Sequence, residues 1–364
     1  MKPLISPTHY TNNEHFEQEK LVLCQQLWNF AGFTTDLEHH NDYICKEIGG
    51  KSVVVQNFYG ELRAFHNVCS HRFSRIRTNN KGNGALQCFY HAWVYDSEGI
   101  PIAIPHQQEF APRLEESRKS LKLEQWLVEK CGAFVFIKKT NDNISLKSYL
   151  GEIYEQLIEF SAAIGKQVQC YEILINANWK VVVENALESY HTWFVHPNSL
   201  GKYGAAKEDY LLYGQHSIYT SNPKKVDRKR DKLLAMANNR SLKIDGYQHY
   251  FVFPMLTLAT FSGMSLTAHV IEPLNATTTK ATNYTFMGKL NDDSLEDILF
   301  NMNSQSTAQL TRVAWEEDKP ICEQVQLGLS EITEKNGIFS REEQRVYEFH
   351  KTYIEFMKAA YVRT

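Results

Sequence analysis

The chain has 364 residues, of which 43% are hydrophobic and 22% are charged, a composition typical of globular proteins with about two domains. Its net charge of −3 gives no reason to expect a nucleic acid or an anionic membrane as a partner. The apolar stretches are too short to cross a membrane, and residues 1–15 lack the apolar core of a secretory signal. A cytoplasmic protein is therefore expected.

Seven cysteines are scattered along the chain, and an odd, dispersed set argues against a disulfide framework. Five of them are expected to be small buried hydrophobic residues. Cys69 and Cys88 differ, because a histidine follows each of them within three residues. That spacing allows a cysteine and a histidine of one loop to bind the same inorganic site.

The N-terminal part of the chain predicts one helix and a small β domain. Residues 16–30 carry apolar side chains at helical spacing. From about residue 43 to residue 104, short alternating runs are separated by glycines, which is typical of antiparallel strands joined by tight turns. The clearest runs are residues 52–55, 61–66, 86–90 and 93–95.

The rest of the chain predicts a larger antiparallel sheet with helices, and hence an α+β fold. Its alternating runs indicate strands at residues 169–175, 247–253, 256–261, 265–271 and 284–287. Its helical spacing indicates helices at residues 146–164, 180–195, 293–317 and 342–362.

Two short motifs place two cysteines and two histidines on two loops. Cys69 and His71 form a C-x-H motif, and after sixteen intervening residues Cys88 and His91 form a C-x-x-H motif. Thiolate and imidazole ligands suit zinc or an iron–sulfur cluster. A finger-type zinc site groups its cysteines and its histidines separately, whereas a Rieske centre binds one iron by two cysteines and the other by two histidines. The motifs favour a Rieske [2Fe-2S] cluster, with a Cys2His2 zinc site as the alternative.

The stretch around these motifs resembles the Rieske domain of ring-hydroxylating and N-demethylating oxygenases. Those families continue with C-x-Y-H-x-W, Y-D-x-x-G and I-P elements, and this chain supplies Tyr90-His91-Ala92-Trp93, Tyr95-Asp96-Ser97-Glu98-Gly99 and Ile104-Pro105. The resemblance assigns Cys69, His71, Cys88 and His91 to the cluster. Phe73 stands where the family usually has glycine. Because a bulky residue disfavours φ > 0, the first cluster loop is expected to have a different shape.

A second group of polar residues lies in residues 178–197, a segment of helical character. Glu188 and His191 are three residues apart and share a helical face, but His191 and His196 are five apart, about 140° around a helix. The two histidines can bind one ion only if the helix ends or bulges between them, which Pro197 favours. Two imidazoles and one carboxylate form the facial triad of non-haem iron(II) oxygenases. The alternative is an amphipathic helix with two hydrogen-bonded histidines.

The N-W-K, E-N, E-x-Y-H and H-P elements of this segment match the iron motif of the same oxygenases in order and spacing. The resemblance makes His191 and His196 ligands of a mononuclear Fe2+. Glu188 falls where the family has an acidic bridge, more often aspartate, which connects His191 to His91 of the partner subunit. Asn185 falls where the family has an asparagine close to the iron. Both Glu188 and Asn185 are expected to be catalytic.

The third iron ligand is expected to be a distant carboxylate. Residues 317–329 resemble the family's E-D…C-E-x-V-Q-x-G-L stretch, in which the aspartate binds iron. Asp318 is therefore the expected ligand, and Glu317 is its nearest rival. Otherwise Glu316 and Glu317 are expected to lie on a solvated helix face.

The resemblance implies an α+β protein in which a Rieske β domain is inserted in a helix-grip-like catalytic domain with a central antiparallel sheet. The expected ranges are 1–39 for the N-terminal part of the catalytic domain, 40–155 for the Rieske domain and 156–364 for the mononuclear iron domain. A head-to-tail homotrimer is also implied, because cluster and iron of one chain are too distant for quick electron transfer. A separate reductase would pass electrons from NAD(P)H through flavin to the cluster.

The resemblance extends to the branch that oxidises quaternary ammonium compounds such as glycine betaine, carnitine, choline and stachydrine with O2, by hydroxylation that leads to N-demethylation or C–N cleavage. The glutamate at the bridge and the tail at residues 341–350 carry this likeness. Such a cation needs aromatic faces, and the candidates are Tyr190, Trp193, Phe194, Tyr203, Tyr250, Phe251, Phe253 and Phe261. The alternatives are an aromatic or heteroaromatic ring hydroxylase of the same architecture and a Rieske electron carrier without a mononuclear iron site.

Overall fold

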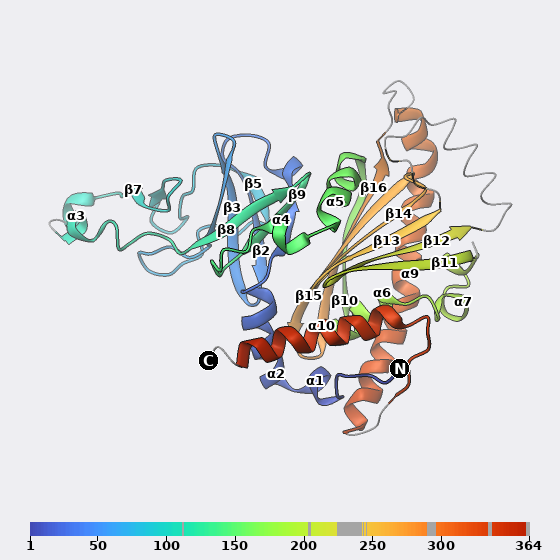
Figure 1. Ribbon diagram of the computed structural model, residues 1–364. Coiled ribbons are helices and arrows are strands. Elements are labelled where there is room, and N and C mark those ends of the chain that lie inside the picture. Colours follow the sequence, from blue (N-terminus) through green and yellow to red (C-terminus); the bar gives the residue numbers. More distant parts are fainter. Residues whose placement is uncertain are drawn as a thin grey trace. The chain divides into compact units, whose positions relative to one another are not determined.

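The chain forms two compact units (Figure 1). One contains Lys20–Tyr149, and the other combines Met1–Glu19 with Leu150–Thr364, so the first is inserted in the second along the chain. The inserted unit begins before residue 40 because β1 (Asn29–Phe33) pairs with β9 (Phe134–Lys138). The computed structural model describes residues 1–110, 113–202, 205–223, 242, 244, 246–289, 296–333 and 337–361.

A seven-stranded antiparallel sheet in the order β1-β9-β8-β4-β3-β2-β5 forms the inserted unit. A separate two-stranded ribbon joins β6 to β7. Its remaining elements are β2 (Asp42–Ile48), β3 (Lys51–Phe58), β4 (Glu61–His66), β5 (Lys81–Asn83), β6 (Val94–Tyr95), β7 (Pro101–Ala103), β8 (Gln125–Cys131), α3 (Arg113–Ser117) and α4 (Leu146–Leu150), with helical turns at Lys20–Cys24, Thr34–Asp36 and Gln107–Phe110.

Two sequence-based expectations for this region are wrong. The helix expected over residues 16–30 ends at Cys24, and the continuous apolar run Asn29–Phe33 forms a fully buried strand. Residues 86–90, expected as a strand, form a turn instead. The reason is local, because the Cys88 N–H donates to the Trp93 carbonyl at 2.9 Å and closes a loop.

The other unit is built on a second seven-stranded antiparallel sheet, in the order β10-β16-β15-β14-β13-β12-β11. The five strands expected from alternation are present, whereas β11 and β12 were not expected. The strands are β10 (Ile164–Ile175), β11 (Ala205–Tyr213), β12 (His216–Pro223), β13 (Tyr247–Val252), β14 (Leu256–Phe261), β15 (Ser265–Asn275) and β16 (Thr278–Gly288).

The helices of this unit are α1 (Thr8–Thr11), α2 (Asn13–Glu19), α5 (Ile153–Ala162), α6 (Trp179–Leu187), α7 (Thr192–Val195), α9 (Glu296–Glu331) and α10 (Gln344–Tyr361), with a helical turn at Leu200–Lys202. Within the described ranges, no helix combines the length and the apolar character needed to cross a membrane. The α+β class, with an inserted β unit and a central antiparallel sheet, is confirmed.

The long helix α9 covers one face of the second sheet. Gln169 and Tyr171 of β10 donate hydrogen bonds to carbonyls of α9. The opposite face receives α5, where Phe160 packs edge-on against Tyr250 of β13 at a ring distance of 5.3 Å. Since side chains alternate along a strand, His249 lies on the α9 face. The helix α9, which carries Asp318, therefore lies on the same side of the sheet as His249.

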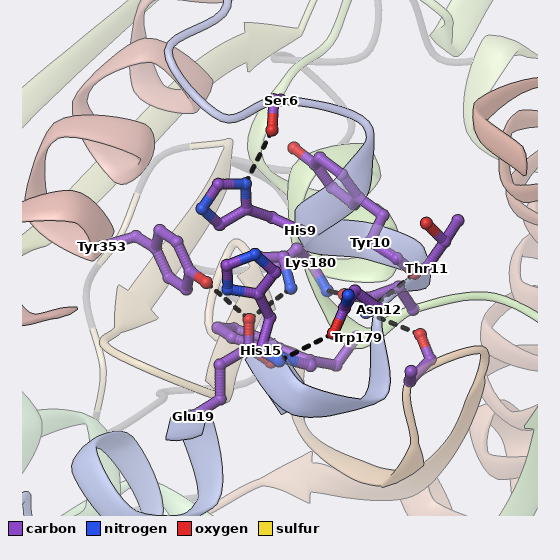
Figure 2. Close-up of polar contacts among 12 residues, drawn as sticks. Ser6, His9, Tyr10, Thr11, Asn12, His15, Glu19, Trp179, Lys180 and Tyr353 are labelled. Carbon is purple, nitrogen blue, oxygen red and sulfur yellow. Dashed lines mark hydrogen bonds and ion pairs between the residues drawn. The ribbon is translucent and has the colours of Figure 1, made fainter. Parts of the chain in front are cut away.

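The N-W-K element anchors the start of α6, the helix that leads to the candidate iron ligands. Asn178 caps the helix by accepting the Lys180 N–H at 2.9 Å. Trp179 Nε1 and Lys180 Nζ donate to the two carboxylate oxygens of Glu19, at 2.8 and 2.5 Å. The Tyr353 hydroxyl donates to the same carboxylate at 2.6 Å. Figure 2 shows these side chains converging from α2, α6 and α10.

Replacing Lys180 by methionine should destabilise this unit strongly, because Lys180 and Glu19 are both fully buried. Breaking a buried ion pair costs about 3–5 kcal/mol, whereas removing both charges costs far less. The double variant Glu19→Gln/Lys180→Met should therefore recover most of the loss in urea unfolding. The matched control is Lys351→Met, which removes a cation from an exposed pair with Glu348. A loss below about 1 kcal/mol for Lys180→Met, the range of surface pairs, would contradict the assignment.

Candidate metal centres

Three expected iron ligands come together in the unit formed by Met1–Glu19 and Leu150–Thr364, which the sequence predicts to be catalytic and which is called the catalytic unit below. His196 Nε2 lies 3.1 Å from Asp318 Oδ1, and His191 Nε2 lies 3.5 Å from the same oxygen. The two Nε2 atoms are 3.3 Å apart. Donors about 2.1 Å from one ion and at right angles to one another lie about 3.0 Å apart. The three side chains therefore offer one face of an octahedral metal site.

Each histidine of this triad turns its other ring nitrogen to a carboxylate. His191 Nδ1 contacts Glu188, and His196 Nδ1 lies 3.1 Å from Glu317 Oε2. Carboxylates in this position fix the tautomer and the ring orientation of a metal-bound histidine. Both Nε2 atoms are thereby directed to a common point beside Asp318.

The backbone achieves this convergence by interrupting the helix earlier than the sequence predicts. The helix expected over residues 180–195 ends at Leu187, and Glu188 is extended with φ −122° and ψ 160°. A short helix then resumes at Thr192 and ends before His196. The Glu188 side chain accepts the His191 N–H at 3.2 Å, so the two residues meet across a turn and not along a helical face.

Glu317 is not the solvated residue that the sequence predicts. Besides its contact with His196, it accepts hydrogen bonds from the Ser199 hydroxyl and from the Asn198 N–H. Its neighbour Glu316 is exposed and pairs with Arg312, as expected. Asn185 lies half-buried in the last turn of α6, and its role beside the iron stays a prediction.

The charges around the triad favour a cation. Burial lowers the pKa of His191, but the nearby carboxylates of Asp318 and Glu188 outweigh burial and raise that pKa to about 9. The same balance raises the pKa of His196. Burial opposes ionisation of Asp318, yet the two imidazoles hold its pKa well below the usual range. Asp318 Oδ1 is also buried without a hydrogen-bond partner among the described residues, as a metal ligand would be.

In the inserted unit, the two cysteine–histidine motifs form two loops of the same design. The Phe73 N–H donates to the Cys69 carbonyl at 2.9 Å, and the Ala92 N–H donates to the Cys88 carbonyl at 3.0 Å. Phe73 has φ 62° and Ala92 has φ 56°. The expectation that Phe73 reshapes the first loop is therefore wrong, because it adopts the left-handed conformation of the glycine that it replaces.

The four expected cluster ligands lie at one end of these loops. Cys69 and Cys88 are buried in the same core cluster, and the rings of His71 and His91 are 4.7 Å apart. His71 stacks on Trp93, and its Nδ1 is buried with no hydrogen-bond partner within the described part of the chain. Two thiols beside two imidazoles, one with an unpaired nitrogen, fit a cluster with mixed ligands.

The Tyr95 side chain contacts the first of these loops. Its hydroxyl lies 3.0 Å from Cys69 Sγ and accepts the Ser70 N–H at 3.1 Å. Sequence reasoning counted Tyr95 only as part of a family motif. Its hydroxyl contacts the thiol of an expected cluster ligand.

The aromatic residues proposed for a cation site divide into two groups. Tyr250, Phe251 and Phe253 are buried in the catalytic unit, whereas Tyr190 and Phe194 are exposed beside the triad turn. Tyr203 lies outside the described residues. Consecutive residues of a strand point to opposite faces, so Tyr250 and Phe251 of β13 do not line one site together.

Two family models match the chain. Residues 156–359 match "Ring hydroxylating alpha subunit (catalytic domain)", and residues 27–125 match "Rieske [2Fe-2S] domain". These domains imply a mononuclear iron and a [2Fe-2S] cluster, which confirms the cofactors expected from sequence. The matched Rieske range also begins before residue 40, as the inserted unit does.

The curated relatives match part of the chain. The carnitine monooxygenase oxygenase subunit of Acinetobacter pittii is 30% identical over 52% of this chain and 51% of its own length. The glycine betaine monooxygenase oxygenase subunit of Chromohalobacter salexigens is 31% identical over 53% and 44%, respectively. The aligned part of the chain thus spans about half the length of these relatives.

A solved structure extends the likeness in fold to the whole chain. The quaternary ammonium Rieske monooxygenase CntA in complex with L-carnitine superposes with a TM-score of 0.77. The superposition covers 98% of this chain and 96% of that protein, at 19% identity. At this identity the likeness supports the fold alone.

Proposed function

The chain belongs to the family of ring hydroxylating alpha subunits, and from this premise we propose that it is the terminal oxygenase of a Rieske non-haem iron monooxygenase system. Its substrate is a small quaternary ammonium compound. The enzyme hydroxylates a carbon beside nitrogen with O2 and electrons from NAD(P)H, and N-demethylation or C–N cleavage follows. The relatives named for carnitine and glycine betaine support this substrate class.

The observation that carries the proposal is the convergence of His191, His196 and Asp318 on one point. When bound there, a ferrous ion supplies open positions for O2, and the cluster supplies electrons. Glu188 and Glu317 accept the Nδ1 protons of the two histidines, so that both Nε2 lone pairs remain available. The buried position of His196 and of the Asp318 Oδ1 atom limits access of water.

This convergence argues against the alternative of an electron carrier without a mononuclear iron site. Such a carrier has no use for a buried two-histidine, one-carboxylate group with its own outer carboxylates. The matched catalytic domain over residues 156–359 argues in the same direction.

The assembly that we propose is a head-to-tail homotrimer served by a separate flavin and iron–sulfur reductase. Exposed aromatic residues at two places support an interface. Phe73, Phe89 and Tyr90 are exposed on the cluster loops, and Tyr190 and Phe194 are exposed beside Glu188. Aromatic side chains of this kind are enriched in protein interfaces, and a heterologous contact of this type closes into a ring.

A substrate panel tests the function. The protein, loaded with iron and cluster, is reduced without oxygen and then exposed to 18O2 with glycine betaine, carnitine or an aromatic acid. We expect formaldehyde or a cleaved amine from a quaternary ammonium compound, with one oxygen atom in product and the other in water. Two electrons and two protons balance this step. Dihydroxylated rings without any product from quaternary ammonium compounds would establish the ring-hydroxylase alternative instead.

A further inference from the structure

The sheet face beneath α9 carries polar side chains deep inside the catalytic unit. Thr257, His269 and Asn283 are cross-strand neighbours in one row across β14, β15 and β16. Trp315 of α9 packs edge-on against His269 at a ring distance of 5.3 Å. Since Asp318 follows Trp315 by three residues on the same helix, it shares its face, and the polar row lies beside the triad.

Several of these polar groups lack a partner. His269 Nε2, Asn283 Oδ1 and Thr285 Oγ1 are buried and make no hydrogen bond to any described residue. Buried polar atoms in native proteins are almost always paired, so each exception requires an explanation. Three such atoms on one sheet face, next to a metal site, point to a polar ligand.

Arg345 of α10 reaches the same face with a buried positive charge. Its guanidinium donates to Ser217 Oγ at 3.0 Å and to the Leu187 carbonyl at 3.4 Å, and lies 3.2 Å from His249 Nδ1. A guanidinium has five N–H donors, so these contacts leave two of them unused. Arg345 is 4% exposed, and it forms no ion pair with a carboxylate of the described residues. Arginine is rarely buried without such a partner.

Arg345 and Asp318 act on the same intervening side chain. Burial raises the pKa of Tyr247, the charge of Arg345 opposes that rise, and the charge of Asp318 adds to it. The ring of Tyr247 stacks on His249 at 6.4 Å, and His249 in turn contacts Arg345. Arg345 and Asp318 therefore both lie near Tyr247, and Tyr247 shares the α9 face of the sheet with His249.

We propose that Arg345 binds a carboxylate of the substrate, so that the substrate is a zwitterion with an ammonium group at one end and a carboxylate at the other. This inference rests on the proposed function and narrows its substrate class. The carboxylate neutralises the buried guanidinium through its unused donors. The ammonium end then lies toward the triad, where Trp315 and Tyr247 offer aromatic faces to a cation.

A ligand panel on the unmodified protein gives the first test. Calorimetry on the iron- and cluster-loaded protein, without oxygen or reductase, compares glycine betaine and carnitine with their methyl esters. A charge-assisted contact predicts that the free acids bind about 10–100-fold more tightly than the esters. Equal affinity of acid and ester overturns this inference alone. Binding of none of the four compounds overturns the proposed function together with it.

The variant Arg345→Gln gives the second test and separates recognition from a structural role. If Arg345 binds the carboxylate, the variant loses the preference for acid over ester, and KM for the acid rises more than kcat falls. If Arg345 only holds the end of α6 through Leu187, acid and ester lose affinity equally, which contradicts the inference. Arg312→Gln, on the exposed face of α9, is the matched control and should keep the preference. If Arg345→Gln does not fold, the ester panel on the unmodified protein decides.

Discussion

Asp318→Ala should keep its iron–sulfur cluster and lose its mononuclear iron. Asp318 Oδ1 is the only oxygen among the three converging donors of the described triad, and the remaining two imidazoles form an incomplete facial set. Loss of a residue that only hydrogen-bonds a metal ligand typically costs about 10–100-fold in metal affinity or activity. Loss of a direct ligand should therefore cost at least about 100-fold in turnover. Metal analysis should fall from three irons per chain to the two of the cluster.

The neighbouring acidic residues of α9 provide a graded control for this experiment. Glu317 touches His196 and not the metal point, so Glu317→Gln should bind iron about 10–100-fold more weakly and keep activity at saturating iron. Glu316 pairs with Arg312 at the surface, so Glu316→Gln should behave like the unmodified protein. Three consecutive acidic residues thus predict three different outcomes.

The opposite ranking would overturn the ligand assignment. If Glu317→Gln lost the iron while Asp318→Ala retained it, Glu317 would be the third ligand and Asp318 its support. The visible spectrum of the cluster should be unchanged in all three variants, because the cluster motifs lie in the other compact unit. A change in that spectrum would indicate misfolding and not the loss of a ligand.

Short motifs of fixed spacing predicted the site well. Cys69, His71, Cys88 and His91 were expected from ligand chemistry, and the loops that carry them have matching hydrogen bonds. The convergence of His191, His196 and Asp318 was expected from the family motif, and the structure brings the three donor atoms together. In both cases the residue types and their spacing are those that metal binding requires, so the site could be predicted from the sequence.

Tertiary context accounts for what the sequence did not reveal. Glu317 has the charge of a solvated helix residue, and only the approach of His196 and Ser199 from a distant segment makes it a partly buried hydrogen-bond acceptor. Glu19 is likewise ordinary in sequence, although it binds Trp179 and Lys180 far along the chain. Pairings over more than a hundred residues leave no local periodicity to detect.

Backbone conformation was the other source of error. Phe73 was expected to avoid a positive φ. Its side chain is 79% exposed, so the left-handed conformation costs only local backbone energy and causes no clash in the core. The break at Glu188 was also expected too late, because Pro197 was taken as its cause. The actual break depends on the Glu188 carboxylate, which accepts the His191 N–H.

At saturating iron, Glu188→Ala should keep both metals and separate reduction of the cluster from turnover. The carboxylate contacts His191 Nδ1, and the proposed bridge to His91 of the partner subunit requires an acceptor at this position. Steady-state oxygen uptake should fall about 100-fold, which is the upper end of the loss seen when a residue that hydrogen-bonds a metal ligand is removed. Rapid mixing of the reduced protein with O2 and substrate should show slow reoxidation of the cluster. Glu188→Asp keeps the acid and should recover part of the rate.

Mixed trimers test whether that bridge lies between subunits. A Glu188→Ala subunit keeps its cluster but lacks the carboxylate that would pass electrons to its own mononuclear iron. A Cys88→Ser subunit keeps that carboxylate but lacks the cluster. Each variant alone should be nearly inactive. Coexpression should restore activity, because the cluster of a Glu188→Ala subunit then faces the intact Glu188 of a Cys88→Ser subunit. If electrons instead passed within one chain, no mixture could contain an intact path, and activity would stay at the level of the separate variants.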